Sequence, residues 1–223
     1  MLLVEKLLSA EKAAEVRELL ASVPQVDGRD TAGPAGQAIK SNLQYDVRHT
    51  NYQQADAMVR QAMFNCEQYQ LYAFPHKMAP VRFAKYTAGM EYGEHLDAAV
   101  MPQANTVLRA DLSFTVFLSA PEDYDGGELV VNLMGIEHSV KANCGDMFVY
   151  PSGNRHRVNV VTRGAREVGV GWVQSVHRSA ERRLVLNYIR TTYNEILQKE
   201  GKTEQFDRLN SAVITLERMW ADV

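Results

Sequence analysis

His95 and Asp97 stand two residues apart in the segment Tyr92-Gly93-Glu94-His95-Leu96-Asp97. In extended backbone this spacing puts both side chains on one face, so an imidazole and a carboxylate can converge. His156 follows the turn-forming segment Pro151-Ser152-Gly153, at the start of a strand-like stretch. Two histidines and one carboxylate can occupy one face of an octahedral Fe(II) ion and leave three coordination positions open. We expect His95, Asp97 and His156 to be both the metal ligands and the catalytic centre.

Arg166 lies ten residues after His156, at the start of the next strand-like segment. Its parity with His156 lets both side chains face the interior of a barrel if the connecting turn preserves the alternation. A buried arginine needs an anion, and its planar fork suits a carboxylate. A co-substrate that chelates iron at one end and presents a carboxylate at the other would satisfy Arg166. The molecule 2-oxoglutarate has that shape.

The elements that must position these residues change character along the chain. Helical spacing predicts a helix capped by Ser9 that runs to Leu20, a second helix over residues 52–66, and two more on either side of Gly201. After Pro80, short alternating segments separated by Gly, Pro and Asp are typical of antiparallel strands. The expected strands are Phe83–Thr87, Leu112–Leu118, Glu128–Leu133, Met147–Tyr150, Arg155–Val161 and Glu167–Val173, with residues 162–165 as the turn that joins the last two.

These strands suit a two-sheet jelly roll. The predicted fold is mostly β with flanking helices, a double-stranded β-helix (jelly roll) plus N-terminal and C-terminal helices. We expect residues 1–76 to form a helical segment that packs on the barrel, residues 77–175 to form the jelly-roll domain, and residues 176–223 to form a helical extension.

Composition narrows the classes of partner. The chain has 223 residues with Lys+Arg 24 against Asp+Glu 27, a formal charge of −3, so nucleic acid is not an expected partner. No apolar run approaches the length of a membrane span, and Glu5 and Lys6 interrupt the apolar N-terminal stretch. We therefore expect a cytoplasmic protein that does not bind membranes. Cys66 and Cys144 have no metal-ligand spacing, and we interpret them as reduced packing residues.

A family resemblance rests on motifs spread over nearly the whole chain. They are Val26-Asp27-Gly28-Arg29, Lys40-Ser41-Asn42, Phe83-Ala84-Lys85-Tyr86, His95-Leu96-Asp97, Arg109-Ala110-Asp111-Leu112-Ser113-Phe114, Tyr124-Asp125-Gly126-Gly127-Glu128-Leu129, Gly145-Asp146, Tyr150-Pro151-Ser152 and Thr162-Arg163-Gly164-Ala165-Arg166. In these motifs the chain resembles the PKHD-type hydroxylases, which are relatives of prolyl 4-hydroxylases among the iron(II)/2-oxoglutarate dioxygenases.

The resemblance implies a specific site and reaction. Fe(II) would be held by His95, Asp97 and His156, Arg166 would bind the distal carboxylate of the co-substrate 2-oxoglutarate, and Tyr86 would be a second anchor. With O2, such an enzyme hydroxylates a C–H bond and releases succinate and CO2, and L-ascorbate is expected as a rescuing reductant. The substrate is unidentified, with a peptidyl or amino-acid-like C–H donor as the expected class. Departures from the family pattern at residues 105–108 and 132–137 concern the substrate side.

Several alternatives stay open on the sequence alone. A cupin-like metal-binding barrel, acting as a non-oxygenase enzyme or a ligand sensor, is the main alternative function. The helical tail could instead serve a protein partner, with the barrel as its scaffold, and a homo-oligomer is compatible with the sequence. Arg109 and Asp111 form either an internal ion pair at the barrel mouth or a substrate contact. Gly126-Gly127 fits a hairpin turn better than a phosphate loop, because no lysine and helix start follow it.

Overall fold

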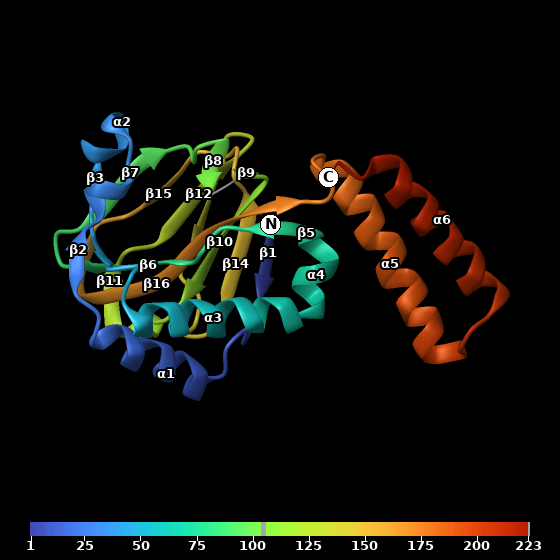
Figure 1. The fold of residues 1–223 in the computed structure, drawn as a ribbon, viewed down its shortest axis with the longest axis horizontal. Helices are drawn as coiled ribbons and strands as arrows, with labels where there is room; N and C mark the ends of the chain where they lie inside the picture. The colour runs from blue at the N-terminus through green and yellow to red at the C-terminus, as the bar shows by residue number, and fades with distance from the viewer. Residues whose placement is uncertain (104–105, 223) are drawn as a thin grey trace.

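The computed structural model describes residues 1–103 and 106–222, so Asn105, in one of the segments that depart from the family pattern, lies outside the described residues. Two antiparallel sheets form the body of the molecule, and helices flank them (Figure 1). The helices are α1 (Ala10–Ala21), α2 (Pro34–Gln37), α3 (Thr50–Asn65), α4 (Glu67–Ala73), α5 (Ala180–Glu200) and α6 (Glu204–Trp220), with short 3-10 turns η1 (Gly28–Thr31) and η2 (Pro121–Asp123).

The larger sheet has nine strands in the described part of the chain. Its order is β1 (Leu2–Val4), β14 (Met147–Pro151), β10 (Leu112–Phe117), β16 (Val161–Ser175), β6 (Arg82–Thr87), β4 (Leu43–Tyr45) and β2 (Gln25–Asp27), while β5 (Pro75–Met78) and β11 (Tyr124–Gly126) also pair with β16. The second sheet has the order β13 (Ile136–Val140), β12 (Leu129–Leu133), β15 (His156–Val158), β7 (Glu91–His95) and β3 (Lys40–Ser41). A separate hairpin joins β8 (Val100–Gln103) to β9 (Thr106–Arg109).

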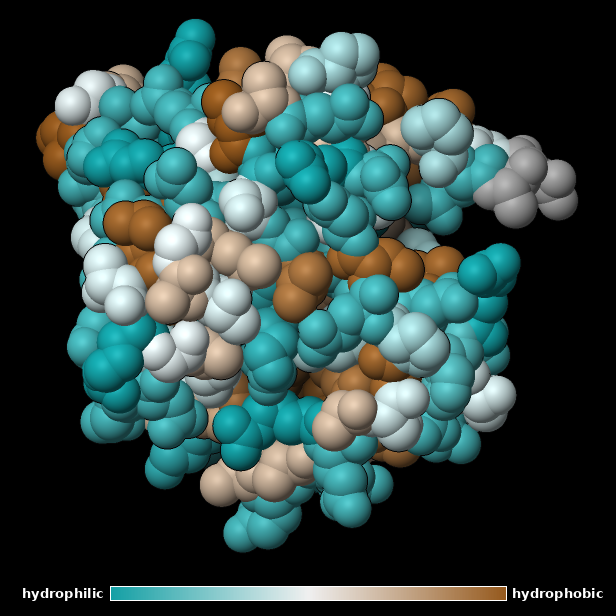
Figure 2. Space-filling view, turned by 90° about the vertical axis from the view of Figure 1, so that its left-hand side faces the viewer, coloured by the Kyte–Doolittle hydropathy of each residue, from teal (hydrophilic) through white to brown (hydrophobic). Residues whose placement is uncertain are grey.

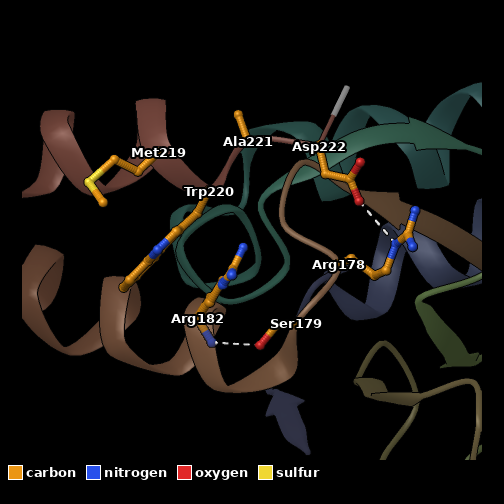
Figure 3. A pocket seen from close by; sticks show the side chains of 7 residues that line it. All are labelled: Arg178, Ser179, Arg182, Met219, Trp220, Ala221 and Asp222. Atoms are coloured by element: carbon orange, nitrogen blue, oxygen red, sulfur yellow. Dashed lines mark hydrogen bonds and ion pairs between the residues drawn. The ribbon is translucent and has the colours of Figure 1, made fainter.

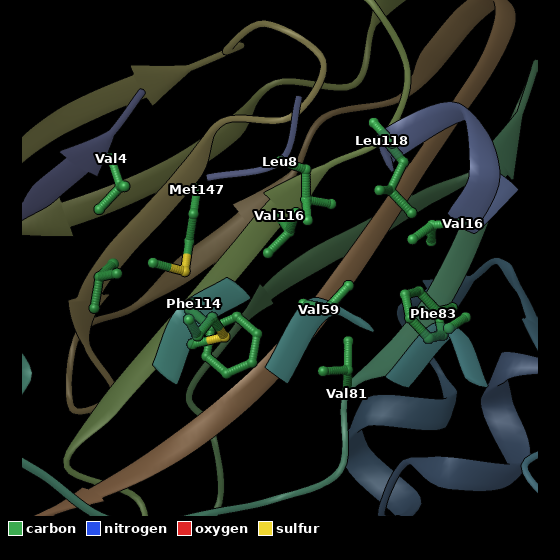
Figure 4. Close-up of a cluster of buried hydrophobic side chains, with 14 of the residues drawn as sticks. Val4, Leu8, Val16, Val59, Val81, Phe83, Phe114, Val116, Leu118 and Met147 are labelled. Atoms are coloured by element: carbon green, nitrogen blue, oxygen red, sulfur yellow. The ribbon is translucent and has the colours of Figure 1, made fainter. Parts of the chain in front are cut away.

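The two faces of the larger sheet bury different sets of side chains. One face packs against α1 and α3, and its core includes Val16, Val59, Phe83, Phe114 and Met147 (Figure 4). The opposite face meets the second sheet, and that core includes neighbours of these residues in the strands, such as Ala84 and Phe148. Successive side chains of β6 and β10 therefore face alternately the helical layer and the interior between the sheets.

The helices α5 and α6 form a hairpin that projects away from the barrel (Figure 1). It packs against the end of α4 through a small core in which Phe74, the residue after α4, meets Leu186 and Val213. Within the described residues, none of the helices has the length and the apolar character that crossing a membrane requires. The face of the molecule on the side of α2 and β3 carries small hydrophobic patches separated by hydrophilic residues (Figure 2).

The predicted fold class is confirmed, and so is the first helix. Ser9 caps α1 by accepting a hydrogen bond from the Lys12 amide, and Ala13, Val16 and Leu20 are its buried residues. Residues 1–76 also supply β1, β2, β3 and β4, which pair with strands of both sheets. The predicted domain boundaries themselves stay a prediction.

The predicted turn at residues 162–165 is wrong. These residues lie inside β16, which runs without interruption from Val161 to Ser175, and β15 is shorter than expected. The break falls at residues 159–160 instead. Gly164 suggested a turn, but its positive φ of 73° serves a close approach, because a Cβ there would lie 1.9 Å from the carbonyl oxygen of Asp123. The strand β11 pairs with this part of β16, and Asp125 forms an ion pair with Arg163.

Candidate active site

His95, Asp97 and His156 meet in the interior between the two sheets. His95 ends β7 and His156 begins β15, and the two are direct partners in the antiparallel register of these strands. Asp97 follows β7 by two residues, as the spacing predicted. One donor atom from each side chain lies within 4.8 Å of the others, and His156 Nε2 is 3.7 Å from Asp97 Oδ2. A single ion with bonds of about 2.0–2.2 Å fits this set of donors.

Backbone carbonyls orient both imidazoles. His95 Nδ1 donates to the Gly93 carbonyl at 2.8 Å, and His156 Nδ1 donates to the Asn154 carbonyl at 3.0 Å. A carbonyl oxygen only accepts, so the proton sits on Nδ1 and each Nε2 keeps a free lone pair for a metal. Burial, and then the neighbouring His156, lower the pKa of His95 to about 4. The His95 ring is therefore neutral near pH 7, in the form that binds metal.

Ser113 positions the carboxylate. Its hydroxyl donates to Asp97 Oδ2 at 2.6 Å, and the Ser152 hydroxyl lies 2.8 Å from the Ser113 oxygen. Ser113 is buried on β10, on the face that looks into the interior. The role of Ser113 was not predicted from the sequence, where the only signal is that Ser113 and Thr115 are hydroxyl residues alternating with apolar ones in β10.

Tyr92 is a second residue that the sequence analysis missed. Its ring stacks on His95 with 3.6 Å between the ring centroids. Strict alternation would put residues 92 and 95 on opposite faces of β7. The pairing of β7 with β15 contains a register shift, since His156 is opposite His95 but Val158 is opposite Tyr92. This irregularity turns both rings toward the interior.

Arg166 is buried deeper in the same interior, with 1% of its surface exposed. It is the register partner of Tyr86 across β16 and β6, and its guanidinium lies 5.2 Å from the Tyr86 ring centroid and 5.8 Å from that of Phe117. Within the described residues, Arg166 Nε and Nη1 and the Tyr124 hydroxyl are buried without a hydrogen-bond partner. A buried cation with free donors destabilises the folded protein unless an anion accepts hydrogen bonds from it.

The surroundings of Arg166 suit a carboxylate. Burial raises the pKa of both Tyr86 and Tyr124, so their hydroxyls stay protonated and can donate. From the sequence, Tyr124 was expected only as part of a family motif. Gly127 has a φ of 66°, and a Cβ there would lie 3.1 Å from the Arg166 side chain. Gly127 thus leaves room beside the Arg166 side chain.

Arg109 and Asp111 form an ion pair rather than a free substrate-facing group. Arg109 Nε and Nη2 donate to the two Asp111 oxygens at 2.7 and 2.9 Å. Arg109 also donates to the Ser175 carbonyl at 3.1 Å and to Asp222 at 3.3 Å. The Ser175 amide in turn donates to Asp111 at 2.9 Å. The pair therefore ties the barrel to the junction with the helical hairpin.

A hollow of about 440 Å³ lies at the base of that hairpin (Figure 3). Arg178 bonds Asp222 across it at 3.0 Å, and the Arg182 guanidinium lies 5.5 Å from the Trp220 ring centroid. It is lined by Arg178, Ser179, Arg182, Met219, Trp220, Ala221 and Asp222, none of which belongs to the candidate active site.

Comparisons with known proteins agree with this geometry. The family model described as the 2OG-Fe(II) oxygenase superfamily matches residues 81–174. A PKHD-type hydroxylase of Acaryochloris marina is 37% identical over 221 residues, covering 99% of each chain. Another, from Colwellia psychrerythraea, is 38% identical over 216 residues, covering 97% of this chain and 96% of the relative.

Solved structures share the fold at lower identity. A Pseudomonas putida prolyl-4-hydroxylase has a TM-score of 0.53 and 23% identity, covering 78% of this chain and 91% of its own. A Trichoplax adhaerens prolyl hydroxylase, in complex with a peptide fragment of the hypoxia inducible factor oxygen degradation domain, has a TM-score of 0.56 and 15% identity. It covers 83% of this chain and 86% of its own.

Proposed function

Because the chain belongs to the PKHD-type hydroxylases of the 2OG-Fe(II) oxygenase superfamily, we propose that His95, Asp97 and His156 hold Fe(II) and that Arg166 binds 2-oxoglutarate. The chain is a dioxygenase, and its family implies Fe(II), 2-oxoglutarate and O2. Membership in this family favours the oxygenase over the alternative of a cupin-like barrel. The observation that carries the co-substrate assignment is the buried guanidinium of Arg166 with two unused donor nitrogens.

The donor set fits the two groups that the family implies. Two imidazoles and one carboxylate suit Fe(II) and leave positions for a chelating co-substrate. When bound, the iron and 2-oxoglutarate would supply the oxidising chemistry together with O2, which would provide one oxygen atom to succinate, formed with CO2 from the co-substrate, and the other to the hydroxylated substrate carbon.

The protein's own residues bind, orient and exclude water. Arg166 has the fork geometry to accept the distal carboxylate in a bidentate pair, and the Tyr86 hydroxyl adds a donor on the neighbouring strand. Phe117, beside the guanidinium, keeps the site dry and so strengthens this charge pairing. Ser113 holds Asp97 in one orientation by donating to Oδ2, the carboxylate oxygen that lies 3.7 Å from His156 Nε2.

The test compares Arg166→Ala with the wild type and with Arg163→Ala. Arg163 lies on the same strand but is exposed and paired with Asp125, so it is a matched control. Calorimetry with the Fe(II)-loaded proteins under argon should show 2-oxoglutarate binding to the wild type and to Arg163→Ala only. All three should keep the metal, whereas His95→Ala should lose it. Equal 2-oxoglutarate affinity in Arg166→Ala and the wild type would reject the assigned role.

The proposed substrate is a peptidyl or amino-acid-like C–H donor, and L-ascorbate is proposed as a reductant that restores Fe(II). The prolyl hydroxylases among the structures with this fold support a donor of that class. An untargeted experiment tests it. The enzyme is incubated with Fe(II), 2-oxoglutarate, ascorbate and cell extract, and mass spectrometry detects any metabolite or polypeptide that gains one oxygen atom. Omitting 2-oxoglutarate should abolish every such gain.

A further inference from the structure

Two cationic side chains converge on one residue beside the candidate metal site. Lys40 Nζ donates to the Thr31 hydroxyl at 3.0 Å, and Arg82 Nη1 donates to the Thr31 carbonyl at 3.4 Å. Lys40 is 8% exposed, which is rare for a lysine without an acidic partner. Within residues 1–103 and 106–222, neither Lys40 nor Arg82 lies within ion-pair distance of a carboxylate.

The strand register brings Arg82 to the metal end of the interior. On β6, Arg82 lies on the same face as Ala84 and Tyr86, and it is opposite Val170 of β16. Two residues further along β16, Trp172 is opposite Ser113, the residue that holds Asp97. The Arg82 guanidinium stacks over Trp172, 5.3 Å from its ring centroid.

Arg82 is therefore distant from Tyr86 and Arg166, which lie at the other end of the interior. It lies four residues along β6 from Tyr86, or roughly 13 Å of strand. The proposed carboxylate site at Arg166 lies opposite Tyr86, so one anion bound there would not neutralise Arg82.

Lys40 approaches the metal site from the second sheet. It is opposite Tyr92 in the pairing of β3 with β7, and its ammonium lies 5.2 Å from the Tyr92 ring centroid. The same ring stacks on His95. Burial, and then the charge of Arg82, lower the pKa of Lys40 to about 8, so the ammonium stays largely protonated at neutral pH. In the described part of the chain, one of its three donors has a protein partner, the Thr31 hydroxyl.

We propose that Lys40 and Arg82 form a subsite for an oxyanion of the substrate, a carboxylate or a phosphate, next to the metal. The inference rests on the proposed function, because it takes His95, Asp97 and His156 as the metal ligands and Arg166 as the co-substrate residue. The substrate is then an acidic molecule whose negative group lies close to the C–H bond that is hydroxylated. The two cations come from different sheets, so the anion would bridge them across the mouth of the barrel.

Trp172 offers a direct readout of binding. The chain has two tryptophans, so Trp220→Phe leaves Trp172, stacked on Arg82, as the sole indole. The Trp220→Phe protein, loaded with Fe(II) and saturating 2-oxoglutarate under argon, is titrated with N-acetylglycine and with glycerol phosphate. N-acetylglycinamide and glycerol are the matched neutral probes. We expect the Trp172 fluorescence to change with an anionic probe and not with the neutral ones, and the tighter of the two anions identifies the group.

Two variants then test the residues. In the Trp220→Phe background, Lys40→Met and Arg82→Met should each raise the half-saturating concentration of the anionic probe by about tenfold or more, because a hydrogen bond to a charged group is lost. Lys199→Met removes the same charge near the end of α5 and should leave that concentration unchanged. Calorimetry should give an unchanged Kd for 2-oxoglutarate in all variants, which also shows that they are folded.

Two outcomes would overturn the inference and are distinguishable. If 2-oxoglutarate binds normally but the anionic probes bind the Trp220→Phe protein and both variants equally, or no better than the neutral probes, the oxyanion subsite is wrong and the proposed function stands. If neither the wild type nor the Trp220→Phe protein binds 2-oxoglutarate, the proposed function fails, and the subsite fails with it.

Discussion

Replacing Arg166 by Met should stabilise the protein without co-substrate while abolishing co-substrate binding. An uncompensated buried charge costs about 3–5 kcal/mol, and Arg166 is 1% exposed with two unpaired nitrogens. The contacts of its guanidinium with the Tyr86 and Phe117 rings offset part of this cost, because each stabilises the folded protein by about 0.5–1 kcal/mol. Methionine is unbranched and flexible and fits the same channel beside Gly127. The net gain is about 2 kcal/mol, which for a chain of this length raises Tm by roughly 4–8 °C.

The assay is thermal unfolding of the Fe(II)-loaded proteins with and without 2-oxoglutarate. A ligand at about 100 times its Kd should stabilise the wild type by about 2.7 kcal/mol and Arg166→Met not at all. Arg163→Met, at an exposed position of the same strand, should keep the wild-type Tm within a degree or two and keep the ligand response. The reasoning is refuted if Arg166→Met lowers the Tm of the ligand-free protein, or if it still gains stability from 2-oxoglutarate.

Three further predictions concern the support of the site. Ser113→Ala should weaken metal binding by about 10–100-fold, because Asp97 loses the hydroxyl that orients it, and metal-competition titration against a chelator of known affinity measures this. In metal-free protein the depressed pKa of His95, about 4 against an ordinary 6.5, means that the unfolded state binds more protons between these values. The free energy of unfolding in urea should therefore fall by up to about 3 kcal/mol as the pH drops from 6.5 to 4, and His95→Gln should flatten this slope. Asp111→Asn should cost about 2 kcal/mol and speed proteolysis at the hairpin junction, since Arg109 loses its bidentate partner.

Each of these three has an outcome that contradicts it. Unchanged metal affinity in Ser113→Ala would mean that Asp97 is held by the fold alone. The same pH slope in His95→Gln and the wild type would assign the titration to another group. Unaltered proteolysis of Asp111→Asn would show that the hairpin is fixed by its apolar contact with Phe74 rather than by the ion pair.

The sequence was sufficient where a physical pattern is local. Alternation in β10 and β14 and helical spacing in α1 follow from burial on one face, and the His-x-Asp spacing follows from strand geometry. The sequence was insufficient where a strand departs from the regular two-residue alternation of its side chains. Tyr92 faces inward only because β7 is irregular opposite His156 and Val158, and no residue type at that point signals it. The inward orientation of Ser113 and Tyr124 depends on which strands become neighbours, which is long-range information.

Arg166 is buried as expected, although the turn on which that expectation depended is absent. The prediction that it faces the interior with His156 assumed a turn at residues 162–165 that would preserve parity, and those residues are strand. Both side chains are nonetheless buried. They come from different sheets, and the chain crosses from one sheet to the other at residues 159–160, after His156 and before Arg166. Arg166 faces the interior because the register of β16 places it opposite Tyr86, whose side chain lies in the core between the sheets.

The two sheets carry different residues of the site. The β7 and β15 strands of the second sheet carry both histidines, whereas the larger sheet carries Arg166 and Ser113. The proposed anion subsite draws one cation from each sheet, Lys40 from β3 and Arg82 from β6. Both of these residues lie beside the proposed ligands without being part of them, so a change at either position can alter the charge that the substrate meets while leaving the metal and co-substrate residues intact. The proposal therefore assigns substrate choice and oxidising chemistry to different residues of this chain, as expected where function depends on individual sites rather than on the fold.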